Sequence, residues 1–162
     1  MTIVPQYQYY LRSLRSIGWG KPLNSLASVF VFNGVVIGIA VLVHYEALYR
    51  LSLLLPRLRI PPRFRVLVGV AGAFMAHVAE VWVFAVGYYL MLKWDTGSRL
   101  GGNFDGTLLD CSYFSFTNYT SLGFGDIEPF GHVRFLSGLE GLTGLILISW
   151  TASFMYIEMQ KF

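Results

Sequence analysis

The chain has 162 residues, of which 55% are hydrophobic and only 13% are charged. A soluble domain carries about 25% charged residues, so this composition excludes an ordinary soluble protein and favours a membrane protein. The net charge of +3 is too small to indicate a nucleic-acid partner, and the single cysteine excludes an intrachain disulfide and a multi-cysteine metal site.

Residues 1–22 are predicted to contain an amphipathic helix that lies in the membrane interface. Apolar side chains recur there at helical spacing, and polar side chains occupy the other faces; the apolar residues are Tyr7, Tyr10, Leu14 and Ile17. A helix that packs on a partner subunit is the alternative interpretation of the same pattern.

Residues 23–48 are predicted to form the first transmembrane helix. They are almost wholly apolar, and a helix of this length crosses a hydrocarbon core of about 30 Å. Asn33 is a polar exception inside the span, and His44 lies near its far end. Gly34 and Gly38 have the G-x-x-x-G spacing that permits close contact between helices.

Residues 49–65 are predicted to form a cytoplasmic loop rich in arginine. The segment holds five arginines and three prolines, and the prolines exclude one long helix. The arginines do not recur at every third position of a span, which excludes a voltage sensor. The positive-inside rule places this loop in the cytoplasm. A secondary expectation is that it binds anionic lipid headgroups, through Arg57, Arg59, Arg63 and Arg65.

Residues 66–92 are predicted to form a second transmembrane helix, which carries His77 and Glu80 one turn apart on one face. Ionisable groups inside a membrane are costly and usually face protein or water. Three interpretations stay open: a hydrogen-bonded structural pair between helices, a proton sensor, and a metal site. The metal site has the least support, because two ligands are too few to hold an ion.

A short helix is predicted over residues 108–120, because Thr107 and Asp110 have the spacing of a capping box. About 13 residues are too few to cross a bilayer. The stretch T-S-L-G-F-G-D follows at residues 120–126, with Gly123 and Gly125 one residue apart. Backbone carbonyls that point to the same side need angles that glycine reaches at low cost. The stretch between two full spans is therefore a candidate pore loop, in which carbonyl oxygens replace the hydration shell of an ion.

Residues 133–157 are predicted to form the last span. Glycine recurs there at every third residue, at Gly138, Gly141 and Gly144, and this permits close packing or bending. Glu140 lies one turn before Gly144 and is another costly acid inside a membrane helix.

Residues 108–157 resemble the pore module of the tetrameric potassium-channel superfamily, which consists of a pore helix, a selectivity filter and an inner helix. The usual filter sequence T-T-V-G-Y-G-D stands here as T-S-L-G-F-G-D. Residues 77–154 also resemble a family of small bacterial ion channels with an H-x-x-E pair and a glutamate in the last helix. The resemblance implies an all-α membrane protein with three transmembrane helices per chain, a re-entrant pore helix and a homotetrameric assembly. Residues 66–162 would be the pore module, preceded by one extra N-terminal span.

The resemblance also implies which residues bind the ion. The filter comprises residues 121–126, and its ion-binding residues are Ser121, Leu122, Gly123, Phe124 and Gly125. K⁺ is expected at the carbonyl oxygens of the first four. Gly144 matches a gating-hinge glycine, and the residues expected to face the central cavity are Leu145, Ile148 and Ala152.

A further set of residues is expected to support the filter: Thr120, Asp126, Tyr113, Phe114, Thr117, Glu80, His77 and Glu140. Tyr113 and Phe114 match the aromatic pair of the pore helix. Thr117 stands where some channels have a glutamate that pairs with the filter aspartate, so Asp126 needs another partner. His77, Glu80 and Glu140 are candidates for one polar network behind the filter that replaces this acid.

These observations predict a potassium-selective channel of the inner or plasma membrane, with no cofactor besides the permeant ions and no enzymatic activity. A weakly selective cation channel is one alternative, since Ser121 replaces the usual threonine. A non-conducting auxiliary subunit with a vestigial pore loop is another. His132, beside the outer mouth, is either a proton sensor or a surface histidine without a role.

Overall fold

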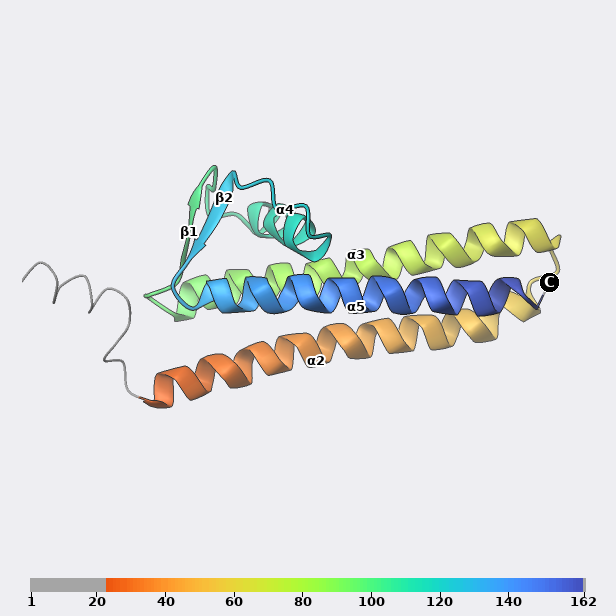
Figure 1. Ribbon diagram of the computed structural model, residues 1–162, viewed down its shortest axis with the longest axis horizontal. Helices are drawn as coiled ribbons and strands as arrows, with labels where there is room; N and C mark the ends of the chain where they lie inside the picture. The colour runs from red at the N-terminus through yellow and green to blue at the C-terminus, as the bar shows by residue number, and fades with distance from the viewer. Residues whose placement is uncertain (1–22, 162) are drawn as a thin grey trace, which may run out of the picture.

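The computed structural model describes residues 23–161, so the amphipathic helix predicted within residues 1–22 lies outside the described residues. Within this range three helices are long and apolar enough to cross a membrane, which confirms the three predicted spans. They run side by side along the long axis of the molecule (Figure 1) and are α2 (Leu23–Leu54), α3 (Pro62–Trp94) and α5 (Val133–Met159).

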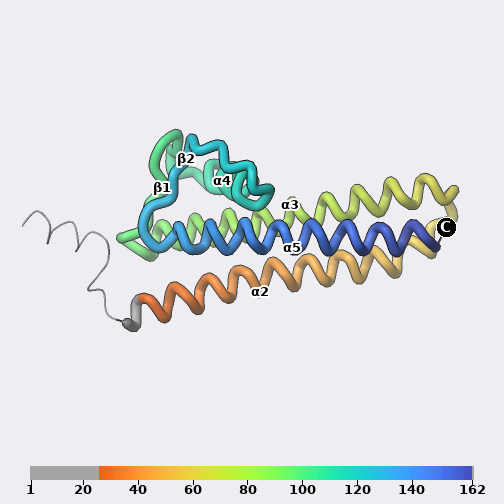
Figure 2. Tube along the Cα trace, viewed as in Figure 1, coloured from red at the N-terminus to blue at the C-terminus, as the bar shows by residue number. Residues whose placement is uncertain are grey.

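The arginine-rich connection is shorter than predicted. Helix α2 continues to Leu54 and ends in the 3₁₀ turn η1 (Leu55–Arg57), and α3 begins at Pro62. Only residues 58–61 lie outside helices, so the predicted loop over residues 49–65 was wrong at both ends. The prolines explain this, because proline is tolerated in the first turn of a helix. Figure 2 shows the C-terminal end of α5 beside this connection.

The short helix predicted before the glycine stretch is confirmed as α4 (Leu108–Tyr119). Its capping box is formed in both directions. The Thr107 hydroxyl oxygen accepts from the Asp110 amide at 3.1 Å, and the Asp110 carboxylate accepts from the Thr107 amide at 3.1 Å. These bonds satisfy two amides that the start of a helix leaves without partners. Helix α4 packs against α3 and α5.

A two-stranded antiparallel ribbon lies beside α4 and is a small addition to the predicted all-helical fold (Figure 1). Its strands are β1 (Arg99–Gly102) and β2 (Ile127–Phe130), with Gly102 opposite Ile127. The sequence does not predict these strands, because four-residue strands rich in glycine and proline show no clear alternation. The ribbon joins the segment before α4 to the segment that follows the predicted filter.

The core lies where α4 meets the outer halves of α3 and α5. Phe84, Tyr88, Phe114, Tyr119 and Leu136 are all buried there. The rings of Tyr88 and Phe114 meet edge to face, with 5.0 Å between their centroids, a favoured geometry for aromatic pairs. The core therefore fixes the position of α4 against the two spans.

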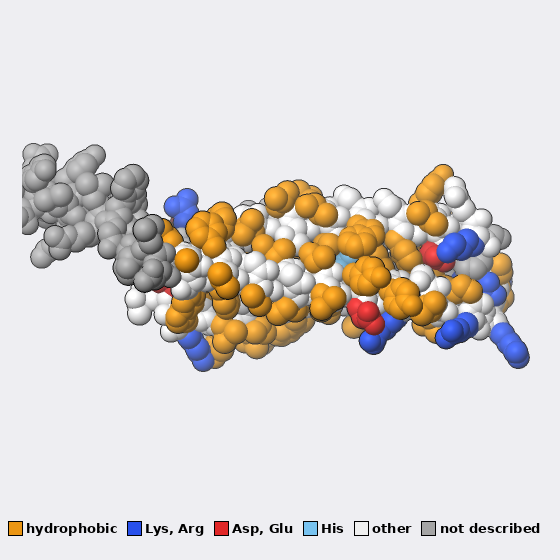
Figure 3. All heavy atoms as spheres, turned by 90° about the horizontal axis from the view of Figure 1, so that it is seen from below, with side chains coloured by type: hydrophobic (Ala, Val, Ile, Leu, Met, Phe, Trp, Pro, Cys, Tyr) orange, Lys and Arg blue, Asp and Glu red, His pale blue; other side chains and the backbone are white. Residues whose placement is uncertain are grey.

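Large apolar side chains cover the outer face of α2 and α3. In Figure 3 they spread along the whole molecule, and most Lys and Arg side chains gather at the end that carries the arginine-rich connection. An apolar surface with charged residues at the two ends of the molecule is typical of a protein that spans a lipid bilayer. A β-carbon added at Gly34 or Gly38 would meet no atom within 4 Å, so their G-x-x-x-G spacing makes no close helix contact inside the described chain.

Candidate functional site

The backbone of residues 121–125 alternates in handedness. Ser121, Gly123 and Gly125 have φ angles of +58°, +51° and +78°, whereas Leu122 and Phe124 have no positive φ. In a strand successive carbonyls point to opposite sides, and an alternation of left-handed with right-handed residues brings them toward one side. Glycine stands at two of the three left-handed positions, where other residues pay a steric cost.

The end of α4 holds the start of this stretch through its backbone. The Thr120 hydroxyl donates to the Phe116 carbonyl at 2.6 Å. The Ser121 amide donates to the Asn118 carbonyl at 2.9 Å, and the Gly123 amide donates to the Thr117 carbonyl at 3.1 Å. The last carbonyls of a helix need such partners. Thr117 therefore supports the stretch through its carbonyl, while its hydroxyl donates to Phe114 within α4.

Asp126 is held on both its side chain and its backbone. The Tyr113 hydroxyl donates to its carboxylate at 2.9 Å, and this bond raises the pKa of Tyr113 above its ordinary value. The Asn103 amide donates to its carbonyl at 2.9 Å. Gly102 has a φ of +90°, and a β-carbon there would overlap the same carbonyl oxygen. Tyr113 is thus the partner that the sequence left unassigned.

Glu140 lies directly behind α4 and is fully buried. Its two carboxylate oxygens accept hydrogen bonds from the hydroxyls of Tyr88 on α3 and Ser115 on α4. The Ser115 hydroxyl also lies 2.9 Å from the Val81 carbonyl. A buried carboxylate is stable only when hydrogen bonds replace its hydration, so Glu140 ties α3, α4 and α5 together at the middle of α4.

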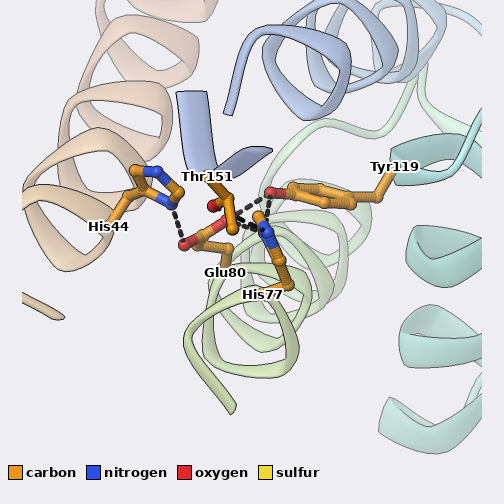
Figure 4. A network of polar contacts seen from close by, with 5 residues as sticks. All are labelled: His44, His77, Glu80, Tyr119 and Thr151. Carbon is orange, nitrogen blue, oxygen red and sulfur yellow. Dashed lines mark hydrogen bonds and ion pairs between the residues drawn. The ribbon is translucent and has the colours of Figure 1, made fainter. Parts of the chain in front are cut away.

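Glu80 is the centre of a second buried cluster, at the C-terminal end of α4 (Figure 4). Its carboxylate lies 2.8 Å from His44 Nδ1 and 3.1 Å from His77 Nδ1. The Tyr119 hydroxyl donates to the same carboxylate and lies 2.9 Å from His77 Nδ1. The other ring nitrogen of His77 is 3.1 Å from the Thr151 hydroxyl. The cluster thus joins α2, α3, α4 and α5.

The single network expected from His77, Glu80 and Glu140 is divided into two. Each carboxylate contacts α4 at its own residue, Ser115 in one case and Tyr119 in the other. Sequence reasoning missed Tyr88, Ser115 and Tyr119, because a hydroxyl on an aromatic-rich helix gives no signal of its partner. His44 carried a weak signal as one of two polar exceptions in the first span.

At Gly144, α5 packs directly against the end of α4. A β-carbon at Gly144 would overlap the Tyr119 carbonyl oxygen, and one at Gly141 would lie 3.5 Å from the Asn118 carbonyl oxygen. Helix α5 runs without a break through this position. The structure therefore gives Gly144 a packing role, and its role as a gating hinge stays a prediction.

The residues predicted to face the cavity share an exposed face of α5: Leu145, Ile148 and Ala152. The side chains of Leu122 and Phe124 are also exposed, at 64% and 66%. None of these side chains is covered by the described part of its own chain. Large apolar side chains are therefore exposed both in the candidate filter and on α5.

His132 is paired rather than free. Its Nδ1 lies 2.8 Å from the carboxylate of Asp95, which also accepts from the Ser98 hydroxyl at 2.6 Å. Asp95 caps the C-terminal end of α3, and His132 precedes α5. The pair therefore joins the end of α3 to the start of α5, and proton sensing by His132 stays a prediction.

Comparison with known proteins gives one match. Residues 68–161, more than half of the chain, match a family described as "Ion channel", which is of the two-helix potassium-channel type. The matched range contains α4, the candidate filter and α5, and it excludes the whole of α2. No curated protein and no solved structure matches the chain significantly.

Proposed function

Since the chain is a multi-pass membrane protein of the ion channel family, we propose that it conducts potassium selectively, through a filter built from residues 121–126 of four identical chains. The observation that carries this proposal is the alternating handedness at Ser121, Gly123 and Gly125. That backbone presents carbonyl oxygens in a row, which is what a dehydrated K⁺ ion needs.

The assembly follows from the number of filter segments. One chain supplies one segment, so a closed ring of carbonyls requires several copies, and fourfold symmetry closes the ring. The exposed apolar side chains of Leu122 and Phe124 support this, since neighbouring copies would cover them. Ions then move between adjacent carbonyl sites by mutual repulsion.

Two charge features favour a cation. The C-terminal end of α4, which carries the negative end of the helix dipole, precedes the candidate filter directly. At the other end of the filter, Asp105, Asp126 and Glu128 are exposed. Four copies of these acids would raise the local concentration of cations at the outer mouth.

The experiment is ion selectivity in a reconstituted bilayer. Reversal potentials in mixed potassium and sodium solutions are expected to follow the potassium gradient. A reversal potential that corresponds to equal permeabilities for potassium and sodium would identify a weakly selective cation channel, which is the alternative that Ser121 favours. An intact purified oligomer without potassium flux would identify a non-conducting subunit.

A pair of matched variants ties the selectivity to the backbone. Gly123→Ala places a side chain at a φ of +51° with no steric neighbour, at a cost of about 1–2 kcal/mol per chain. It is expected to reduce selectivity strongly. Gly138→Ala introduces the same atom on α5 where nothing lies within 4 Å, and it is expected to leave selectivity unchanged.

We also propose that anionic lipid headgroups bind at the arginine-rich end of the molecule. Arg57, Arg59 and Arg63 are exposed there, whereas Arg65 is half-buried. Each such charge contributes about 1 kcal/mol of attraction to an anionic membrane surface. Replacing the three exposed arginines by glutamine is expected to reduce retention of phosphatidylglycerol in native mass spectrometry. Arg134→Gln, at the opposite end, is the control.

A further inference from the structure

We propose that His44, His77 and Glu80 form a binding site for a divalent transition-metal ion, for which Zn²⁺ is the expected occupant. The Tyr119 hydroxyl oxygen supplies the fourth position. The inference concerns metal binding and stands independently of potassium selectivity. The sequence offered only two ligands one turn apart, and the fold brings the third from α2.

The ligand atoms already converge on one point. One atom from each of the two histidines and the glutamate lies within 4.8 Å of the other two. His44 Nδ1 and His77 Nδ1 approach different oxygens of Glu80, at 2.8 and 3.1 Å. Ligands around a tetrahedral Zn²⁺, at about 2.0–2.2 Å from the ion, lie roughly 3.3–3.5 Å apart. A separation of the side chains by about half an ångström therefore accommodates the ion.

The donor set selects the kind of ion. Imidazole nitrogens with a carboxylate suit zinc and its neighbours, whereas magnesium, calcium and potassium prefer oxygen ligands alone. Two histidines and a glutamate with one further position is a known ligand count for zinc. The permeant ion of the proposed channel is therefore a poor competitor for this site.

The surroundings favour a bound cation. The side chains of His44 and Glu80 are 0% exposed, and that of His77 is 20% exposed. A carboxylate at this depth is costly without a positive partner, and a divalent ion supplies that charge. The Thr151 hydroxyl lies 3.1 Å from His77 Nε2 and orients the ring from behind, as hydrogen bonds to metal-ligating histidines usually do.

The position of the site gives it a structural consequence. His44 belongs to α2, which lies outside the residues matched by the ion channel family, whereas Tyr119 is the last residue of α4. A metal ion bound here would fasten the extra N-terminal span to the helix end that holds Ser121 and Gly123. It would therefore link α2 to the candidate filter.

The test measures metal bound to the purified full-length protein in lipid nanodiscs. The protein is stripped with a chelator, incubated with Zn²⁺, freed of excess metal and analysed by mass spectrometry of the metal content. One Zn²⁺ per chain is expected. Mutation of a residue that only hydrogen-bonds to a metal ligand already weakens metal binding by roughly 10–100-fold. Loss of a ligand itself, in His44→Ala or His77→Ala, is therefore expected to lower the Zn²⁺ affinity by at least about 100-fold.

The remaining histidine provides the matched control. The chain has three histidines, and His132 pairs with Asp95 away from this cluster. His132→Ala is expected to bind Zn²⁺ like the unchanged protein. The proposal is overturned if the unchanged protein binds no Zn²⁺, or if His132→Ala loses the metal as completely as His44→Ala.

A second measurement needs no variant and so does not depend on variant folding. Co²⁺ replaces Zn²⁺ and reports coordination through its visible absorption. Intense bands of a four-coordinate ion are expected for the unchanged protein. The weak bands of a six-coordinate ion would contradict the site, whatever the conductance of the protein.

Discussion

The Tyr113 hydroxyl donates a hydrogen bond of 2.9 Å to the Asp126 carboxylate and so joins α4 to the last residue of the candidate filter. Thr117 cannot take this role, because its hydroxyl is bonded to Phe114. The candidate filter is therefore braced at its C-terminal end from the first half of α4, and at its N-terminal end from the last turn of the same helix.

Tyr113→Phe removes this brace while keeping the ring. We expect lower potassium selectivity and faster loss of current, because Asp126 then keeps only its backbone bond to Asn103. Reversal potentials and the decay of current at constant voltage measure the effect. Tyr156→Phe removes a hydroxyl from an exposed tyrosine on α5 and serves as the control. Equal behaviour of the two variants would contradict the role of Tyr113.

Glu140→Gln should destabilise the protein although the two side chains have the same size. Two hydroxyls donate to Glu140, from Tyr88 and Ser115. Glutamine keeps one acceptor oxygen for Tyr88, and the Ser115 hydroxyl can donate to the Val81 carbonyl instead. The cost is therefore the exchange of hydrogen bonds to a charged acceptor for weaker bonds to a neutral one, about 1 kcal/mol. Thermal unfolding of the purified protein measures this loss.

The double variant Glu140→Gln with Tyr88→Phe identifies the origin of that loss. It removes the Tyr88 hydroxyl that bonds to the side chain at position 140, so the same bond is lost only once. We therefore expect the double variant to be more stable than the sum of the two single effects predicts. Strict additivity would mean that Tyr88 and Glu140 act separately.

Conductance tests the predicted role of Glu80 and Glu140 in supporting the filter. This prediction would be wrong if Glu80→Gln and Glu140→Gln both left conductance and selectivity unchanged.

Gly144→Ala distinguishes close packing from hinge bending. The added carbon meets the Tyr119 backbone carbonyl, which cannot move without displacing the end of α4. Overpacking of this kind costs about 1–3 kcal/mol, so we expect a lower melting temperature. A hinge glycine would instead gain stability from alanine, since alanine is the better helix former by about 1 kcal/mol.

Gly138→Ala is the control for that comparison. It makes the same change on the same helix, at a position with nothing within 4 Å of the new atom. We expect its melting temperature to be unchanged or raised. A Gly144→Ala protein that is as stable as Gly138→Ala would favour the hinge.

The capping box of α4 predicts a pH dependence at the outer end. Bonds from Thr107, first from its backbone amide and then from its hydroxyl, hold the pKa of Asp110 below its ordinary value. The unfolded chain then binds more protons than the folded chain as the solution becomes acidic. Stability from this group is present above the unfolded pKa and is lost as pH falls through the folded pKa.

Asp110→Asn should flatten the acidic limb of a plot of melting temperature against pH. An unchanged acidic limb would show that Asp110 contributes nothing there.

The sequence alone determined the features that depend on neighbours along the chain. Apolar runs longer than the membrane is thick predict the three spans, and the Thr107 to Asp110 spacing predicts the start of α4. Two glycines one residue apart predict the unusual backbone, and φ angles of +51° and +78° at Gly123 and Gly125 agree with it. These features need only helix geometry, capping chemistry and steric freedom.

The partners of the buried polar groups were decided by the tertiary structure alone. His44 and Glu80 are 36 residues apart, and Tyr88 and Glu140 are 52 apart. Such pairs depend on how each helix is rotated about its axis. A span that is apolar on every face has no periodic pattern of apolar residues, so its sequence does not predict that rotation. The same holds for Gly144, because its contact with Tyr119 depends on how α4 packs against α5. The sequence therefore shows which helices exist, and packing between them decides which side chains meet.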